Sequence, residues 1–279
     1  MALLKVDRQR CEKEGTCVEV CPIGILALDA AEGPVVRPGM GRYCIACGHC
    51  VAACPHGALD NLRNPLSGQA PLAHFPVLDP NTALTFLRSR RSIRNFKADP
   101  VPRELTLKLL EAARYAPSGH NSQGIGYLVV EQPKDIERIS AIVVEWMVHT
   151  VEAQPELAAR LHMPGIIKAH QRGEDRILRK APLLIVATAP VELRAAQVSS
   201  YLALEYAELY ATALGLGTCW AGFAQVCAQQ YPPLAKFLNI PVERAVTGML
   251  MAGFPKFSYY RLPERNPLQV VWFGEDEDG

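Results

Sequence analysis

The placement of the cysteines constrains this chain more than any other feature of its sequence. Seven of the nine cysteines lie within residues 11–54. Four of these follow the spacing C-x2-C-x2-C-x3-C with a proline directly after it: Cys44, Cys47, Cys50 and Cys54. A cubane iron–sulfur cluster needs several thiolates on one short loop, because the loop must wrap the cluster and leave one corner for a distant ligand. We therefore expect the amino-terminal segment to fold around inorganic clusters.

A second, less complete run precedes the first. Cys17, Cys21 and Pro22 repeat the end of the same spacing, and Cys11 stands where the first cysteine of that run belongs. In paired runs of this kind, the fourth cysteine of each run ligates the other cluster. We assign one [4Fe–4S] cluster to Cys44, Cys47, Cys50 and Cys21. Most of a second cluster is assigned to Cys11, Cys17 and Cys54.

Glu14 occupies the position where the second cysteine of the first run belongs. Three outcomes are open at this corner. Glu14 ligates the fourth iron through oxygen, or the site loses that iron and holds a [3Fe–4S] cluster, or water or hydroxide completes a full cluster. A carboxylate is a harder ligand than a thiolate and is displaced more easily.

Disulfides and zinc are two other uses of clustered cysteines. Disulfides fit poorly, because the number of cysteines is odd and the chain begins without the apolar stretch of a secretion signal. A structural zinc site also uses Cys-x2-Cys pairs. Two C-x3-C-P endings in tandem favour clusters over zinc, and they favour a reducing compartment.

The composition narrows the possible partners and locations. The formal net charge is only +1, so the chain has no general electrostatic attraction for nucleic acid or anionic membranes. The longest uncharged apolar run, residues 181–191, is too short to cross a bilayer. Hydrophobic residues make up 49% of the chain, enough for a real core. We expect a soluble, cytoplasmic protein.

Residues 1–64 resemble the two-cluster bacterial ferredoxins over their whole length. Between the cysteine runs, residues 25–29 and 34–37 flank a glycine-containing turn, which predicts a short hairpin. Residues 65–80 contain four prolines and predict a semi-rigid linker. Residues 81–279 form the remaining, larger part of the chain.

Helices and strands follow one another in an uneven order in this larger part. Strands are predicted from apolar and β-branched runs at 127–131, 183–189, 245–251 and 269–273. Helices are predicted at 83–89, from Pro102 to Pro117, in pieces between 134 and 180, and at 195–214. This order indicates an α+β body with a mostly antiparallel sheet flanked by helices. The helix at 195–214 is apolar enough to belong in a core or a subunit interface.

An arginine-rich stretch is the first candidate binding site of the body. Residues 88–94 contain four arginines, with Ser92 among them, in a nearly neutral chain. Guanidinium groups supply forked donors and a hydroxyl adds another, which suits a phosphate, although some of these arginines can instead complement the end of a helix. Three further stretches stand out: the polar turn 116–123, the segment 215–222, and Arg265 with the residues after it.

These four stretches, in this order and at this spacing, resemble the flavin-dependent nitroreductase family over residues 81–275. Together with the cysteine runs, they resemble the ferredoxin-fused branch of that family. The resemblance implies a dicluster ferredoxin-like domain followed by a nitroreductase-type antiparallel sheet flanked by helices. It implies FMN and two iron–sulfur clusters as cofactors, and homodimers with FMN at the subunit interface.

The resemblance also assigns roles to residues of this chain. The FMN phosphate is assigned to Arg90, Arg91, Ser92 and Arg265. Arg94 matches a cation at the pyrimidine edge of the flavin, where reduced flavin carries negative charge. Asn121 matches an amide that hydrogen-bonds the ring, and the same wall contains Pro117, Ser118 and Gln123. The backbone N–H groups of Ala221 and Gly222 match the loop that faces flavin N5 and O4.

Two positions depart from the pattern of that family. Many members have an acidic residue where this chain has Ala221, and many have a second lysine where it has Gly124. Fewer charges therefore line the expected pocket, and its substrate preference is open. Cys219 and Cys227 fall outside the cluster motifs, and we expect them to be buried free thiols.

The two parts together predict an FMN-dependent oxidoreductase. Its clusters would pass electrons to FMN, which would reduce an organic acceptor such as a nitroaromatic, a quinone or an enone-like compound. The electrons would come from an external donor that is ferredoxin-like or linked to NAD(P)H. The alternative is an electron-relay module of a larger redox complex, without a substrate of its own. No side chain is assigned as a catalytic acid.

Overall fold

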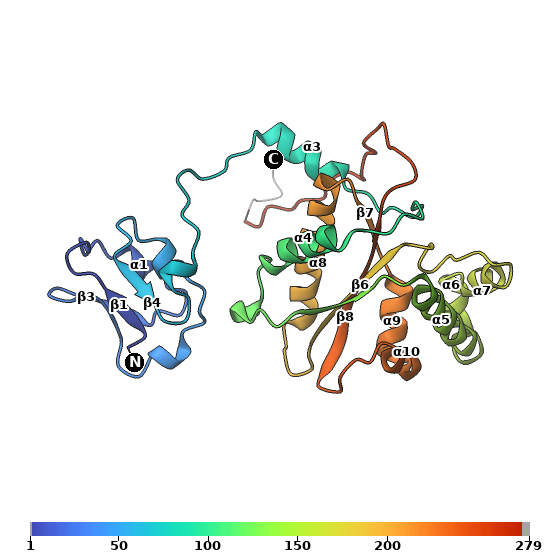
Figure 1. Cartoon of the computed structure of the whole chain (residues 1–279), viewed down its shortest axis with the longest axis horizontal. Coiled ribbons are helices and arrows are strands. Elements are labelled where there is room, and N and C mark those ends of the chain that lie inside the picture. Colours follow the sequence, from blue (N-terminus) through green and yellow to red (C-terminus); the bar gives the residue numbers. More distant parts are fainter. Residues whose placement is uncertain (1, 275–279) are drawn as a thin grey trace.

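The computed structural model describes residues 2–274 and contains two parts, which we call the head and the body (Figure 1). The head is the cysteine-rich segment up to Asn64. The body begins with helix α3 (Pro80–Ser89), in which Pro80 occupies the first turn and the Asp79 side chain accepts a hydrogen bond from Thr82 N at 2.8 Å. The connecting residues hold a short 3-10 helix, η2 (Leu66–Gly68), and residues 70–79 form no helix or strand.

Two small antiparallel sheets build the head. Strand β1 (Leu4–Val6) pairs with β4 (Leu59–Asn61), so the two ends of the head lie side by side. Strand β2 (Leu26–Asp29) pairs with β3 (Gly33–Val36), which confirms the predicted hairpin. Three short helices complete the head: α1 (Thr16–Glu19), η1 (Gly41–Tyr43) and α2 (His49–Ala52). Its small core contains Ile25, Leu26, Val51 and Leu59, and several of the cysteines pack against it.

A four-stranded antiparallel sheet forms the centre of the body, in the order β5-β6-β8-β7. The strands are β5 (Gly126–Val130), β6 (Leu183–Pro190), β7 (Gly217–Trp220) and β8 (Arg244–Gly253). Three of these match predicted strands, and the antiparallel sheet flanked by helices confirms the α+β fold class.

Helices cover both faces of this sheet. Successive side chains of a strand point to opposite faces, and β6 shows this clearly: Leu183 and Ile185 join one core cluster, whereas Leu184 and Val186 join the other. The first face packs against α4 (Arg103–Arg114) and α8 (Ala196–Ala213). The second face packs against α5 (Pro133–Ala153), α6 (Pro155–Arg160), α7 (Met163–Gln171), α9 (Gly222–Gln230) and α10 (Pro232–Phe237).

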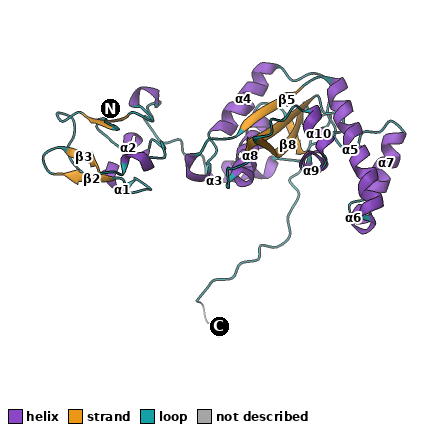
Figure 2. Ribbon diagram, turned by 90° about the horizontal axis from the view of Figure 1, so that it is seen from below, coloured by secondary structure: helices purple, strands orange, loops and turns teal. Residues whose placement is uncertain are grey.

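One predicted strand of the body does not form, and three described elements of the body were not predicted. Residues 269–273 form no strand; they are exposed within the last described part of the chain, which runs away from the body (Figure 2). Their β-branched and aromatic residues favour a strand, but a strand also needs a neighbour to satisfy its backbone groups. Conversely, residues 217–220 form strand β7, and helices α9 and α10 follow it, where no such elements were predicted.

Helix α8 confirms the helix predicted at 195–214 and has two different faces. Its buried face packs on the sheet through small residues such as Ala203 and Ala207. Its other face exposes an apolar stripe that recurs every four residues: Val198, Leu202, Tyr206 and Tyr210. Among the described residues, no helix is long and apolar enough to cross a membrane.

Candidate functional site

Three cysteines of the second run and Cys21 line one cavity of the head. Its walls contain Cys21, Cys44, Cys47 and Cys50, which is the ligand set assigned from the sequence. Asn61, at the end of β4, lies 3.8 Å from both Cys44 Sγ and Cys50 Sγ through its side-chain Nδ2. Burial raises the pKa of the Cys50 thiol, and the Asn61 hydrogen bond opposes this. N–H···S hydrogen bonds of this kind help to set the potential of a cluster. Asn61 was not predicted.

A second cavity contains the other thiols. It is lined by Cys11, Cys17 and Cys54, together with Glu14 and His56. The Ala58 N–H donates to Cys54 Sγ at 3.3 Å. Burial, followed by the charges of Cys54 and Cys11, raises the pKa of the Cys17 thiol.

Glu14 lies at the wall of this second cavity, as its position in the cysteine run predicts. His56 Nε2 lies 3.6 Å from Glu14 Oε1 and 3.6 Å from Glu12 Oε2. The Glu14 carboxylate can therefore pair with His56 or turn toward the cavity, and whether it ligates iron stays a prediction.

The two cysteine sets fit clusters better than single metal ions. A tetrahedral zinc site needs its ligands to converge on one position. Among the described residues, no three His, Cys, Asp or Glu side chains converge in this way. The thiols instead surround two separate cavities, each with cysteines from both runs, which is the arrangement that two clusters with an exchanged fourth ligand require.

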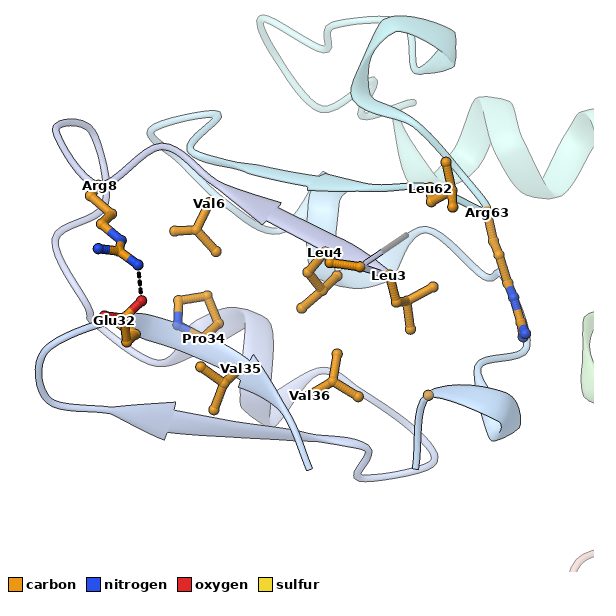
Figure 3. Close-up of a pocket in the computed structure, with 12 residues that line it drawn as sticks. Leu3, Leu4, Val6, Arg8, Glu32, Pro34, Val35, Val36, Leu62 and Arg63 are labelled. Carbon is orange, nitrogen blue, oxygen red and sulfur yellow. Dashed lines mark hydrogen bonds and ion pairs between the residues drawn. The ribbon is translucent and has the colours of Figure 1, made fainter. Parts of the chain in front are cut away.

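A third cavity of the head has no thiol in its lining. It is an apolar groove of about 620 Å³ between β1 and β3, lined by Leu4, Val6 and Val36 among others, with an Arg8–Glu32 ion pair at one end and Arg63 at the other (Figure 3). The groove was not predicted, and none of the predicted cofactor residues lines it.

The arginine-rich stretch is held against helix α8 and the segment after β8. Arg90 Nη1 donates to Glu208 Oε1 at 3.0 Å, and Arg90 Nε lies 3.8 Å from Glu205 Oε1. The Arg91 guanidinium lies over the Tyr259 ring at 4.8 Å, and Arg88 pairs with Glu264 at 3.3 Å. These contacts bring residues 88–92 next to residues 259–264, which precede the exposed Arg265. The predicted phosphate residues thus come from segments that lie side by side.

Glu208 is a buried acid that the sequence reasoning missed. Its Oε1 accepts from Arg90 and from Thr218 Oγ1 at 3.1 Å, whereas its Oε2 has no hydrogen-bond partner among the described residues. Burial raises the pKa of the Glu208 carboxyl, and the charge of Arg90 opposes this. The presence of a charged residue in a largely apolar helix could have indicated this buried acid from the sequence.

Residues 92–94 run along the free edge of β7. Ser92 pairs with Thr218 in a parallel bridge, and Ile93 N donates to Thr218 O at 2.8 Å. This brings Arg94 to a cavity of about 400 Å³ that Trp220, Gly222 and other residues also line. Ala221 is buried just before α9, and a Cβ added at Gly222 would have no atom within 4 Å, so the backbone is open there. Arg94 and Gly222, which were predicted to face one ligand, therefore share a cavity.

Two further arginines line the same cavity, Arg176 and Arg179, and neither was predicted. Asp175 accepts backbone hydrogen bonds from Ile177, Leu178 and Lys180, and the turn so formed holds Arg179 in the left-handed region at φ 59°. Trp146, Trp220 and Phe223 also line the cavity. Cys219 lies at its wall, and burial raises the pKa of this thiol; Cys219 and Cys227 are buried and free, as predicted.

The polar turn at 117–123 does not line the cavity that contains Arg94 and Gly222. Pro117, Ser118 and Gln123 line a different cavity of about 380 Å³, beside the half-buried Tyr127, whose pKa burial raises to about 12. Gln123 N donates to Ser118 Oγ at 3.1 Å, and Gly119 N donates to Ser199 Oγ at 3.3 Å. The predicted cofactor residues thus divide into two groups, which we call the arginine half-site (residues 90–94 and 221–222) and the loop half-site (residues 117–123).

The two half-sites contact helix α8 at positions well separated along its axis. The loop half-site contacts the helix at Ser199, and the arginine half-site contacts it at Glu208. These residues are nine positions apart, which corresponds to about 14 Å along a helix axis at about 1.5 Å per residue. The two half-sites of one chain therefore contact α8 at different points along its length.

Asn121 of the loop half-site contacts the head. Its Nδ2 donates to Ile45 O at 3.0 Å and to Ala46 O at 3.1 Å, and these carbonyls lie between Cys44 and Cys47 in the chain. The loop with η3 (Gly119–Asn121) projects toward the head in Figure 1. No sequence signal pointed to this contact, because it joins segments about 75 residues apart.

The head is built to present these carbonyls. Ala46 adopts a left-handed conformation (φ 55°), and its carbonyl also accepts a hydrogen bond from Asn64 Nδ2 at 3.0 Å. Gln69 Nε2 in turn donates to Asn64 Oδ1 at 2.9 Å. Gly48 allows this packing, because a Cβ there would lie 2.8 Å from Asn64 Nδ2. A chain of amides therefore runs from the linker to the contact with the body.

Comparison with known proteins identifies both parts of the chain. The family model described as "Nitroreductase family" matches residues 87–254, and the one described as "4Fe-4S dicluster domain" matches residues 10–59. A protein named NADH dehydrogenase from Thermus thermophilus is 32% identical over 214 residues, which cover 72% of this chain and 98% of that protein.

Solved structures share the fold of the body. A nitroreductase with bound FMN from Bacteroides fragilis is 20% identical and superposes with a TM-score of 0.55, covering 68% of this chain and 98% of its own. A second nitroreductase with bound FMN, from Desulfitobacterium hafniense, is 22% identical with a TM-score of 0.55, covering 70% and 100% of the two chains.

Proposed function

The chain belongs to the nitroreductase family and carries a 4Fe-4S dicluster domain at its amino end, and we propose that it is an FMN-dependent oxidoreductase with its own electron supply. Bound FMN would convert single electrons from the clusters into a two-electron reduction of an organic acceptor. The arginine half-site would hold the phosphate through Arg90, Arg91 and Ser92, together with Arg265 from the exposed segment after β8. Arg94 would stabilise negative charge at the pyrimidine edge, and the open backbone at Gly222 would let the ring approach closely.

The contact between Asn121 and the head carries this proposal. It joins the loop between two cluster ligands to the loop that matches the flavin wall of the family. In a chain with two separate functions these loops would have no reason to meet. Of the two clusters, the one assigned to Cys21, Cys44, Cys47 and Cys50 would then be the electron donor to the flavin. The cluster beside Glu14 would receive electrons from outside.

We propose a homodimer as the functional unit, since each chain supplies the two half-sites at separate places along α8. The exposed stripe of Val198, Leu202, Tyr206 and Tyr210 lies on the same helix and suits a subunit interface. If two copies pack α8 against α8 around a two-fold axis, the loop half-site of each copy approaches the arginine half-site of the other. Two flavins per dimer would follow.

The acceptor would bind beside Arg94 in the cavity of about 400 Å³. Trp146, Trp220 and Phe223 line it with flat apolar surfaces, and Arg94 and Arg179 add positive charge. This combination suits a planar acceptor with electronegative oxygens, such as a nitroaromatic, a quinone or an enone.

Anaerobic purification followed by a count of iron, sulfide and flavin per chain tests the cofactors. Mixing the protein with a reduced ferredoxin and then with nitrobenzene or a quinone tests the reaction. Bleaching of the flavin followed by product formation is the expected result. Zinc in place of iron, or chains without flavin, would overturn the proposal. Flavin that reduces but turns over no acceptor would favour a relay module instead.

A further inference from the structure

Among the described residues, the head is hydrogen-bonded to only one of the two half-sites of its own chain. Asn121 donates hydrogen bonds to both carbonyls of the loop between Cys44 and Cys47. It belongs to the loop half-site, which contacts the amino end of α8 at Ser199. Arg90 of the arginine half-site pairs with Glu208, which lies about 14 Å further along that helix. The described residues of the head make no hydrogen bond or ion pair with residues 88–94 or 217–222.

This one-sided contact has a consequence in a symmetric dimer. In the proposed dimer, the loop half-site of one chain completes the arginine half-site of the other chain. The head lies beside the loop half-site of its own chain, because Asn121 is hydrogen-bonded to the head. The head of each chain therefore lies next to the flavin whose phosphate the other chain holds.

We propose that electron transfer crosses the dimer interface: the cluster at Cys44, Cys47 and Cys50 of one chain reduces the FMN anchored by Arg90 and Arg265 of its partner. This inference rests on the proposed dimeric FMN enzyme and adds which chain's cluster reduces which chain's flavin. Two single-electron transfers from the reduced cluster, with two protons from solvent, balance the conversion of oxidised FMN to its two-electron-reduced form. A ferredoxin-type protein supplies both electrons to the head and is oxidised in turn.

Asn121 is the positioning residue of this arrangement. Only the nitrogen of its amide can face two carbonyl oxygens, so the network itself fixes which end points at the head. Its Oδ1 accepts no hydrogen bond from the described protein residues, so it can accept one from a ligand. One side chain can thus touch both the cluster loop and a ligand. Docking of the head and binding of the flavin would then stabilise each other by the same free energy.

Heterodimers of complementary variants test the direction of transfer. The first partner carries Cys47→Ala, which removes the cluster next to the loop; the second carries Arg90→Glu, which removes the phosphate anchor. Two different affinity tags isolate the mixed dimer, and the flavin count is expected to be one per dimer. Its single flavin is held by the Cys47→Ala chain and faces the intact head of its partner. We expect photoreduced ferredoxin to bleach this flavin at the wild-type rate.

The reciprocal heterodimer gives the opposite result. It combines a wild-type chain with a chain that carries both substitutions, so the flavin is held by the wild-type chain and faces the disabled head. We expect bleaching to fall to the background of the Cys47→Ala homodimer. Fast bleaching in this dimer, with slow bleaching in the first, would mean that each head serves its own chain and would overturn the inference.

The same set of proteins separates this inference from the proposed function. Arg265→Glu, at an exposed residue, replaces Arg90→Glu if loss of the Glu208 partner unfolds the chain. Flavin retained by both charge-reversal homodimers would overturn the proposed phosphate site and the inference with it. A wild-type protein that is monomeric by light scattering would overturn the dimer. If the charge-reversal homodimers lose flavin, but bleaching is slow in the first heterodimer and fast in the reciprocal one, only electron transfer between chains is overturned.

Discussion

In the head, all the candidate metal ligands come from residues 11–54, whereas the body draws its candidate residues from positions as far apart as 90 and 265. The loops that bring the cysteines together are short, and closing short loops costs little entropy. The body must first form a sheet in the correct register before Arg94 can lie beside Gly222. The head therefore acts as a local site and the body as one that depends on long-range packing, and each prediction below tests one side of this difference.

The largest effect is expected from the local site. Cys47→Ala removes a ligand that no other residue nearby can replace, so the cluster in that cavity is lost and electrons no longer reach the flavin. Iron analysis should show a fall to about half, because each of the two clusters holds roughly equal iron. Cys219→Ala is the matched control, since it removes a buried thiol of the body. Unchanged iron in Cys47→Ala would show that the ligand set is misassigned.

Arg90→Ala should give the largest loss of stability in the body. It leaves the fully buried Glu208 carboxylate without its cationic partner, and breaking a buried pair costs about 3–5 kcal/mol. Denaturant unfolding measures this loss. The double variant Arg90→Met with Glu208→Leu removes both charges and should recover most of the stability while FMN binding stays weak. Recovery of both properties would argue against a phosphate role for Arg90.

The same carboxyl predicts a pH dependence. Burial raises the pKa of Glu208 above its ordinary value of 4.5. Such a group contributes stability that is complete below its unfolded-state pKa and is lost as pH rises through its folded-state pKa. The free energy of unfolding of the wild type should therefore fall, relative to Glu208→Gln, as pH rises above 4.5. Parallel curves for the two proteins would mean that Arg90 fully compensates the burial.

Asn121→Ala should weaken the joint between head and body without unfolding either. It removes two hydrogen bonds, each worth about 1 kcal/mol. We expect faster proteolysis of the linker at residues 70–79 and slower reduction of the flavin by the head. Ser122→Ala changes the same loop without touching the head and is the control. Equal proteolysis of the two variants would contradict a docking role for Asn121.

The smallest effect is expected at Ala46, whose left-handed backbone presents a carbonyl to Asn121. A residue with a Cβ pays about 1–2 kcal/mol in this conformation, but glycine makes the unfolded chain more flexible. Ala46→Gly should therefore raise the free energy of unfolding of the head by less than about 1 kcal/mol. Thermal unfolding of the cluster-loaded protein measures it. A clear loss of stability would show that the alanine methyl packs in a way the backbone does not reveal.

The sequence predicted the local features of this molecule better than the distant ones. The cysteine spacing predicted which thiols share a cavity, and apolar and β-branched runs predicted β5, β6 and β8. Residues 269–273 have the same composition but lack a neighbouring strand, so composition alone was misleading there. Glu208, Arg179 and Asn61 were missed, because their importance comes from what the fold places beside them. The division of the cofactor residues into two half-sites was also beyond sequence, since it depends on where each loop meets α8.

Helix α8 sets the spacing between those two half-sites, and this makes the helix a ruler as well as a support. A substitution on its surface changes one contact, but an inserted or deleted residue shifts one end by about 1.5 Å and turns it by about 100° relative to the other. Both halves would remain intact while no longer facing their counterparts. Substitutions on the surface of α8 should therefore be tolerated far more readily than insertions or deletions within it.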